Sequence, residues 1–222
     1  MLDNPAWSAL TGAHAHLAEG SGLARRYPAE VSPFAAIADE SDPQAWRDLA
    51  QLVGPGGVAL LTGPRTTTPD GWTVTEGDQG VQLVGESVPG EPYDDAVVLD
   101  GDDVPDMLDL VMRTRPGPFH ARTIELGGYL GVRREGRLVA MAGRRLHPAG
   151  WTEISAVCTD ESHRGHGLAS RLVLAVAHGI RADGDVPMLH AHASNTAAIA
   201  VYERLGFRLR YRPRFELLRA PG

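Results

Sequence analysis

Lysine is absent from this sequence, and cysteine occurs only once. All 21 basic residues are therefore arginine. The single cysteine, Cys158, excludes an internal disulfide and favours a cytoplasmic protein. No apolar run approaches the ~20 residues that a membrane-spanning helix requires. Residues 1–10 do not pair a basic segment with an apolar one, so we expect no signal peptide. These absences predict a soluble cytoplasmic protein without a membrane partner.

Acidic residues outnumber basic ones, and the excess lies in one part of the chain. The net charge is −7. Residues 1–93 carry 4 arginines and 12 acidic residues, whereas residues 94–222 carry 17 arginines and 16 acidic residues. Because non-specific nucleic-acid binding depends on neutralising phosphates, we expect no nucleic-acid partner. We predict two parts, an N-terminal region over residues 1–93 and a second domain over residues 94–222.

The second part, residues 94–222, alternates strand and helix patterns. We expect the order β-α-β-β-β-α-β-α-β, which is an α/β fold with a mixed sheet. The expected strands are 96–99, 128–133, 138–145, 153–159, 188–193 and 207–217. Three helices are expected: one capped by Asp102 or Asp103 that runs through Thr114, one that begins at Leu168, and one over 196–205. The first of these helices has Pro105 in its first turn, where the missing N–H group is tolerated.

The first part, residues 1–93, gives weaker patterns. We expect helices over 6–17 and 43–53 and a buried strand over 57–62. Residues 72–76 and 80–84 are expected to form a hairpin, with Gly77-Asp78 in its turn. Residues 64–71 and 88–93 are expected to be loops.

The most informative segment follows the strand over 153–159. A short polar loop leads into a glycine-bearing turn, and a long helix begins there with apolar residues at helical spacing. A helix N-terminus has unpaired N–H groups and a positive dipole end, so it binds anions. Small residues let a phosphate approach the backbone. The turn has the sequence Arg164-Gly165-His166-Gly167-Leu168-Ala169 and continues with Ser170.

Two kinds of cofactor site fit a turn of this type. A dinucleotide site requires a third glycine, where Ser170 stands, and an acid at the end of the next strand, near His192. The pattern Arg-x-x-Gly-x-Ala instead resembles the GNAT superfamily of acyl-coenzyme A-dependent N-acyltransferases. A later pattern is similar to the same family, and it stands here as Asn195, Ala198, Tyr202, Gly206 and Phe207.

The resemblance covers roughly residues 94–219 and implies a GNAT-like acyltransferase fold. It also implies acetyl-coenzyme A as cosubstrate, without a metal. The turn residues would then hold the pyrophosphate, while the end of the preceding strand would pair with the pantetheine arm, helped by Asn195. The implied cofactor-binding residues are Val157, Cys158, Thr159, Arg164, Gly165, His166, Gly167, Leu168, Ala169, Ser170, Asn195 and Tyr202. Some members of the family carry a degenerate, non-catalytic copy of the fold, which residues 1–93 would represent.

Two side chains are candidates for catalysis. By resemblance, Tyr202 protonates the departing thiolate, and the alternative is an aromatic ring packed against Phe207. Glu153 is a candidate general base, because an amine must lose a proton before it attacks. The alternative for Glu153 is a salt bridge with an arginine of the neighbouring hairpin.

The sequence gives less support for a functional role of the other reactive side chains. We expect Cys158 to be a packing residue, because direct transfer needs no thiol and a nucleophilic cysteine needs an activating base. His190 and His192 share a strand face, but two ligands are too few for a metal. Glu125, in the loop around residues 119–125, is a candidate for attracting the acceptor amine, and the alternative is a solvated loop acid.

The sequence therefore predicts an N-acyltransferase that moves an acetyl group to a primary amine. A small molecule or a peptide is the expected acceptor. Two alternatives stay open, a non-catalytic coenzyme A sensor and an interaction module on the same fold. The oligomeric state is also open, and a homodimer is compatible with the sequence.

Overall fold

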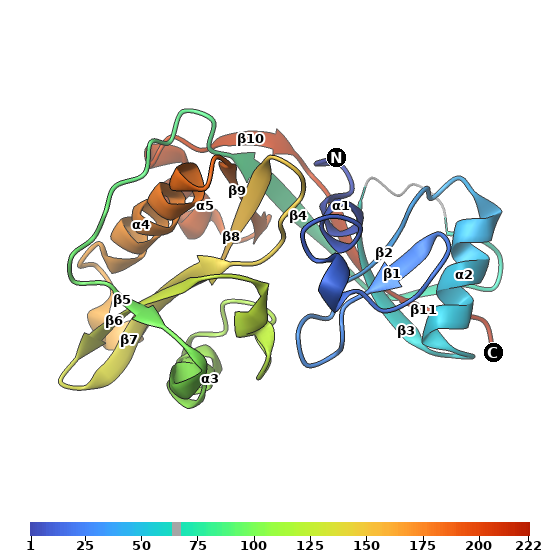
Figure 1. Ribbon diagram of the computed structural model, residues 1–222, viewed down its shortest axis with the longest axis horizontal. Helices are drawn as coiled ribbons and strands as arrows, with labels where there is room; N and C mark the ends of the chain where they lie inside the picture. The colour runs from blue at the N-terminus through green and yellow to red at the C-terminus, as the bar shows by residue number, and fades with distance from the viewer. Residues whose placement is uncertain (64–67) are drawn as a thin grey trace.

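The computed structural model describes residues 1–63 and 68–222, so the first half of the loop expected over residues 64–71 lies outside the described residues. Within the described part, nine strands form one mixed sheet (Figure 1). Eight of them follow the order β3-β11-β4-β9-β8-β7-β6-β5, and β10 pairs with β4. These strands are β3 (Val58–Gly63), β4 (Thr73–Val84), β5 (Val97–Leu99), β6 (Tyr129–Arg134), β7 (Arg137–Arg144), β8 (Trp151–Thr159), β9 (Val186–His192), β10 (Arg208–Tyr211) and β11 (Arg214–Arg219).

Helices cover both faces of the β5–β9 part of the sheet (Figure 1). On one face, α4 (Leu168–Ala182) and α5 (Thr196–Arg204) close a core that includes Val139, Leu172 and Leu189. On the other face, α3 (Val104–Thr114) packs over Leu138 and Met141. Successive strand residues point to opposite faces, so the single strand β7 contributes to both cores.

The mixed α/β fold is confirmed, and in residues 94–222 the expected order of elements is confirmed from β5 through α5. Short 3-10 turns precede α3 (Gly101–Asp103), β6 (Thr123–Leu126) and α4 (Glu161–His163). The hairpin between β6 and β7 turns at Glu135 and Gly136, which have φ angles of 52° and 79°. Two consecutive positive φ angles are typical of the turn type that matches strand twist.

The last expected strand, 207–217, was wrong as a single element. The structure has two strands, β10 and β11, separated at Arg212 and Pro213. Proline lacks the N–H group that a ladder requires, so it interrupts a strand that is paired on both sides. The break also changes partners: β10 pairs with the second half of β4, whereas β11 lies between β3 and the first half of β4.

The hairpin expected over residues 72–84 was also wrong. Those residues form one strand, β4, which continues through Gly77 and Asp78. Its first half, up to Gln79, pairs with β11, and its second half, from Gly80, pairs with β9. Long-range pairing therefore overrides the local turn signal at Gly77-Asp78.

The remaining elements precede β4 and pack beside the sheet. They are α1 (Pro5–Leu10), a 3-10 turn (Ala15–Leu17), β1 (Ala24–Arg26), β2 (Ala35–Ile37) and α2 (Pro43–Val53). The expected helix over 6–17 is shorter because the chain turns between Thr11 and His14, beyond the cap at Thr11. The division into domains at residue 93 stays a prediction, and β3 and β4 share the sheet with strands of residues 94–222. Within the described residues, no helix is long and apolar enough to span a membrane.

Candidate functional site

The two parallel strands β8 and β9 separate in the middle of the sheet. Their ladder runs from Trp151↔Val186 to Ile154↔Leu189 and goes no further. Ala156 has a φ angle of 53°, and the register between β7 and β8 shifts nearby, which marks a β-bulge. Among the described residues, the edge of β8 that faces β9 therefore has no strand partner from Ser155 to Thr159, and its backbone groups are available to a ligand.

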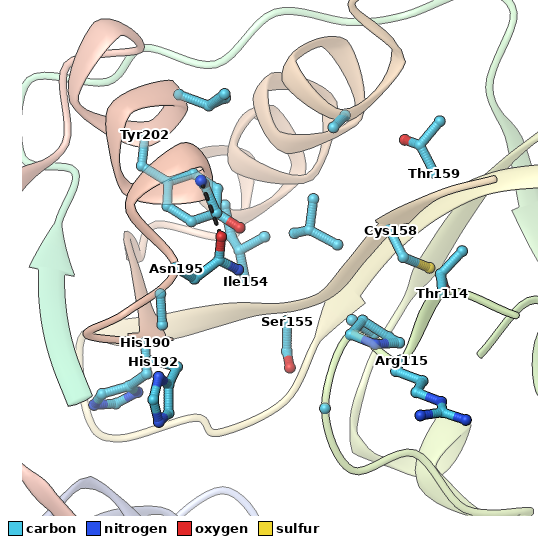
Figure 2. Close-up of a pocket in the computed structure, with 18 of the residues that line it drawn as sticks. Thr114, Arg115, Ile154, Ser155, Cys158, Thr159, His190, His192, Asn195 and Tyr202 are labelled. Carbon is cyan, nitrogen blue, oxygen red and sulfur yellow. Dashed lines mark hydrogen bonds between the residues drawn. The ribbon is translucent and has the colours of Figure 1, made fainter. Parts of the chain in front are cut away.

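A cavity of about 1000 Å³ occupies this separation. Its walls come from β8, the turn before α4, β9 and α5, and it continues over the face of β3, β4 and β11. Figure 2 shows Ser155 and Cys158 of β8 across the cavity from Tyr202 of α5 and from Asn195, which precedes α5, with His190 and His192 at one end. The volume is that of a typical ligand site.

The glycine turn presents an uncapped helix N-terminus to the cavity. Gly165 and Gly167 have φ angles of 82° and 75°, which favour glycine. Gly167 occupies the N-cap position of α4 and provides no side-chain hydrogen bond. The first hydrogen bond within the helix is from the Arg171 N–H group to the Gly167 carbonyl, 3.1 Å. The preceding N–H groups, Leu168 to Ser170, therefore fit an anion such as a pyrophosphate.

Nearly all of the predicted cofactor-binding residues line the cavity. They are Val157, Cys158, Thr159, Arg164, Gly165, Gly167, Leu168, Ala169, Ser170, Asn195 and Tyr202. His166 is the exception: its side chain is exposed, and its Nδ1 atom lies 3.3 Å from the His163 carbonyl. The Asn195 side chain accepts a hydrogen bond from the Ala198 N–H group, 3.2 Å, so Asn195 caps α5 where it borders the cavity.

Tyr202 combines a buried ring with a hydroxyl at the cavity. The residue is 8% exposed, and its ring packs against Phe207 with centroids 6.2 Å apart. Its hydroxyl points into the space between α5 and β8 (Figure 2). Burial raises the pKa of Tyr202 to about 12, with a further contribution from nearby Cys158. The phenol therefore stays protonated at neutral pH, as a proton donor requires.

Cys158 is a buried thiol rather than an activated one. Burial raises its pKa to about 11, which outweighs a hydrogen bond involving Thr114. A nucleophilic cysteine needs the opposite shift. The structure thus agrees with the expectation that Cys158 is a packing residue.

Glu153 lies in the interior, and it does not line the cavity. Both of its carboxylate oxygens accept hydrogen bonds from Arg145, at 2.9 and 2.6 Å, and Oε1 lies 2.7 Å from His190 Nδ1. Burial raises the pKa of Glu153, but the charge and hydrogen bonds of Arg145 outweigh it and hold that pKa well below its usual range. This geometry favours the alternative, a salt bridge with the end of the neighbouring hairpin. The role of general base stays a prediction.

His190 extends this buried network to the N-terminal region. Arg210 donates to Gln82 Oε1, 2.8 Å, which fixes the orientation of the Gln82 amide. The amide nitrogen of Gln82 then donates to the Leu2 carbonyl and to His190 Nε2, at 2.8 and 3.0 Å. His190 therefore carries its proton on Nδ1, directed at Glu153. Among the described residues no cluster could hold a metal ion.

Some cavity residues had no signal in the sequence. One end is lined by Phe34, Leu60, Glu76, Asp78, Phe215 and Leu217, which belong to β3, β4, β11 and the segment before β2. Most of them lie on strands, where alternation shows which residues share a face. It does not show which face borders the cavity until the pairing partners are known. The loop around residues 119–125 does not line the cavity. Its Glu125 pairs with Arg122 at 2.6 Å, in agreement with the alternative of a solvated loop acid.

Comparison with known proteins identifies relatives over the whole chain. The family model for FR47-like proteins matches residues 129–215. A solved structure from Novosphingobium aromaticivorans, assigned to the acetyltransferases of the GNAT family, is 40% identical with a TM-score of 0.90, and the match covers 100% of this chain and 99% of that chain. A GCN5-related N-acetyltransferase from Kribbella flavida is 16% identical with a TM-score of 0.68, over 99% of this chain and 96% of that chain. At that identity the likeness shows the fold alone.

Curated relatives match in sequence over part of their length. A mycothiol acetyltransferase from Thermomonospora curvata is 29% identical over 186 residues, which cover 80% of this chain and 57% of the relative. One from Saccharopolyspora erythraea is 38% identical over 82 residues, which cover 36% of this chain and 27% of the relative. The chain thus spans about half the length of the first of these curated relatives and less of the second.

Proposed function

Because the chain belongs to the GNAT family, we propose that it transfers an acetyl group from acetyl-coenzyme A to an amine. The observation that carries the proposal is the cavity that joins an uncapped helix N-terminus to the separated strands β8 and β9. One end fits phosphate, the middle offers an unpaired strand edge, and the far end leaves room for an acceptor.

Three parts of the chain would hold the cosubstrate. The N–H groups of Leu168 to Ser170 would bind the pyrophosphate, and Arg164, which lines the cavity, would add a positive charge. The free edge of β8 would pair with the pantetheine amides as an added strand does. Bound there, acetyl-coenzyme A would supply a thioester whose carbonyl the amine attacks.

The chain's own contribution to transfer is positioning and proton donation. An N–H group on the free edge of β8 would hydrogen-bond to the developing oxyanion. The Tyr202 hydroxyl would donate a proton to the departing sulfur, and the proton that the attacking nitrogen loses would return through water to the phenolate. A thiol has a pKa near ~8.5, so its thiolate leaves readily and the acid contributes modestly. Neither role requires a thiol nucleophile, in keeping with the raised pKa of Cys158.

The acceptor is the least constrained part of this proposal. The matched residues cover 57% of one relative named as a mycothiol acetyltransferase and 27% of another, so we do not assign their acceptor to this chain. A small-molecule amine or a peptide amine fits the proposal.

The test is a calorimetric titration of the purified protein with acetyl-coenzyme A, beside adenosine diphosphate and a nicotinamide dinucleotide. We expect selective binding of acetyl-coenzyme A, followed by thiol release when amines are added. Binding of the dinucleotide alone would contradict the assignment of the turn. Binding of acetyl-coenzyme A without transfer to any amine would instead favour a coenzyme A sensor.

A further inference from the structure

The cavity has a second end, away from the glycine turn, which we call the chamber. It is built by residues that the cosubstrate does not require. It lies over the face of β3, β11 and β4, beyond the separation of β8 and β9. In the pairing of β11 with β4, Phe215 stands opposite Asp78 and Leu217 stands opposite Glu76. Leu217 also pairs with Leu60 of β3. Directly paired residues project to the same face, so this surface combines apolar side chains with two carboxylates.

Aromatic rings form one wall of this chamber. The rings of Phe34 and Phe215 lie with centroids 6.2 Å apart, and both line the cavity. Phe215 lies over Gly80, where an added Cβ atom would meet the ring at 2.3 Å. The glycine thus allows the ring its position, and the wall suits a flat or apolar body.

The positive groups of the chamber are already matched. The Arg145 guanidinium binds both oxygens of Glu153 and lies 5.0 Å from the centroid of the Phe34 ring. His190 donates to the same carboxylate and accepts from Gln82. These buried groups add little net charge to the chamber.

The carboxylates of Glu76 and Asp78 remain accessible. Both residues are exposed, and the Asp78 side chain keeps 68% of its surface while contacting His192 Nε2 at 3.0 Å. Other charged residues that line the cavity are the arginines Arg115, Arg164 and Arg204, which come from the end of α3, the turn before α4, and α5. None of the three has an ion-pair partner within the described residues. Among the described residues that line the cavity, the carboxylates thus both belong to β4.

We propose that the chamber binds an acceptor amine that has an apolar or aromatic body and a second, cationic group. The body packs against Phe34, Phe215 and Leu217, and the second cation lies between Glu76 and Asp78. An anionic acceptor, such as an amine with a carboxylate at the same position, is repelled by this pair. The inference rests on the proposed function, because acyl transfer defines the reacting amine.

Three acceptors with one body test this charge preference. They are 1,4-bis(aminomethyl)benzene, 4-methylbenzylamine and 4-(aminomethyl)benzoate, which carry a cation, a methyl group and an anion at the same position. With saturating acetyl-coenzyme A and thiol release as readout, we expect kcat/KM for the diamine to exceed that for the monoamine about tenfold. The carboxylate compound should be slower again, and added salt should reduce these differences.

Substitutions test whether the charge preference comes from Glu76 and Asp78. In the double variant Glu76→Gln, Asp78→Asn, the ratio of kcat/KM between diamine and monoamine should fall towards one. Glu86→Gln removes an exposed carboxylate elsewhere and should keep the wild-type ratio. An unchanged ratio in the double variant, or an equal rate for all three compounds, overturns the proposal.

A binding measurement separates this proposal from the proposed function. Calorimetry with 1,4-bis(aminomethyl)benzene and coenzyme A-saturated protein needs no turnover. If the wild type binds the diamine and the double variant does not, the acceptor chamber is supported even when no thiol is released. The absence of thiol release would then contradict only the proposed acyl transfer. The opposite outcome is that the wild type gives no binding heat and that the three acceptors react at equal rates. The proposed acceptor site is then wrong, whereas observed thiol release would still support acetyl transfer.

Discussion

At the scale of single residues, the proposed function makes Tyr202 the side chain on which turnover should depend most directly. We expect Tyr202→Phe to lower kcat about 100-fold while acetyl-coenzyme A binding changes little, because only the proton donor is lost. The measurement is steady-state kinetics beside calorimetry. Tyr93→Phe removes another hydroxyl and serves as the control. Unchanged turnover with saturating amine would remove Tyr202 from the mechanism.

The pH dependence gives the same residue a second test. The pKa of Tyr202 is raised to about 12, so the protonated, donating form persists at every pH below that value. An alkaline decline in kcat between about pH 8 and pH 10 should therefore not arise from Tyr202. If such a decline is present in the wild type and absent from Tyr202→Phe, the assignment of this pKa is wrong.

Cys158 should be dispensable for chemistry. Because burial holds its pKa near 11, we expect Cys158→Ala to keep turnover within about twofold of the wild type. The smaller side chain should cost about 1 kcal/mol of unfolding free energy, from lost packing. Kinetics and urea unfolding measure the two effects. A folded variant that fails to turn over would point to a covalent acyl-cysteine route.

At the scale of elements, helix α4 has glycines with positive φ at both ends. Gly167 precedes the helix and Gly184 follows it, with φ angles of 75° and 89°, and an added Cβ atom meets nothing within 4 Å at either position. Gly167→Ala and Gly184→Ala should each cost about 1–2 kcal/mol of unfolding free energy. Only Gly167→Ala should weaken acetyl-coenzyme A binding, by at least about tenfold, because only there does the methyl group face the phosphates. Equal affinity in both variants would contradict the role of the turn.

The accuracy of sequence-based prediction also differed among elements. Helix α2 and strand β3 were placed almost to the residue, because an apolar period and flanking turn residues coincide there. The glycine turn and Tyr202 could be placed at the cavity from the sequence because each lies in a short local motif. Strand β4 was misjudged because Gly77-Asp78 is a local turn signal, while the partners that keep β4 extended lie more than a hundred residues away.

The same limit explains what the sequence could not say about the site. Glu153 has a strand position compatible with catalysis, and only the fold shows that Arg145 and His190 take up its carboxylate. Glu76 and Asp78 lie in a segment whose pairing was mispredicted, so their place at the cavity could not be foreseen. Side chains that act through distant contacts escape analysis of local patterns.

At the scale of the whole molecule, a buried histidine links stability to pH. His14 is 4% exposed, and its Nδ1 atom lies 2.9 Å from the Tyr27 hydroxyl. Burial lowers its pKa to about 4, helped by His147 and His16, so the folded state keeps it neutral where the unfolded state binds a proton. Stability is therefore lost as pH falls from about 6.5 towards 4.

Between pH 7 and pH 5, this single group should lower the unfolding free energy by about 2 kcal/mol. Urea denaturation at the two pH values measures the difference. His14→Asn should reduce it, whereas His120→Asn, which changes an exposed histidine, should leave it unchanged. An undiminished difference in His14→Asn would assign the pH dependence to other groups.

The placement of β4 also has a consequence for how the chain folds as it is made. Gln82 of β4 pairs with His190 of β9, 108 residues later, so the centre of the sheet has a high contact order. At a synthesis rate of ~5–20 residues per second, β4 waits roughly 5–20 seconds on the ribosome before β9 is complete. A nascent chain stalled before β9 should therefore be cut by protease within residues 73–84, and the finished protein should resist cleavage there. β4, which lies inside the finished sheet, is therefore exposed to misfolding until its partners are made.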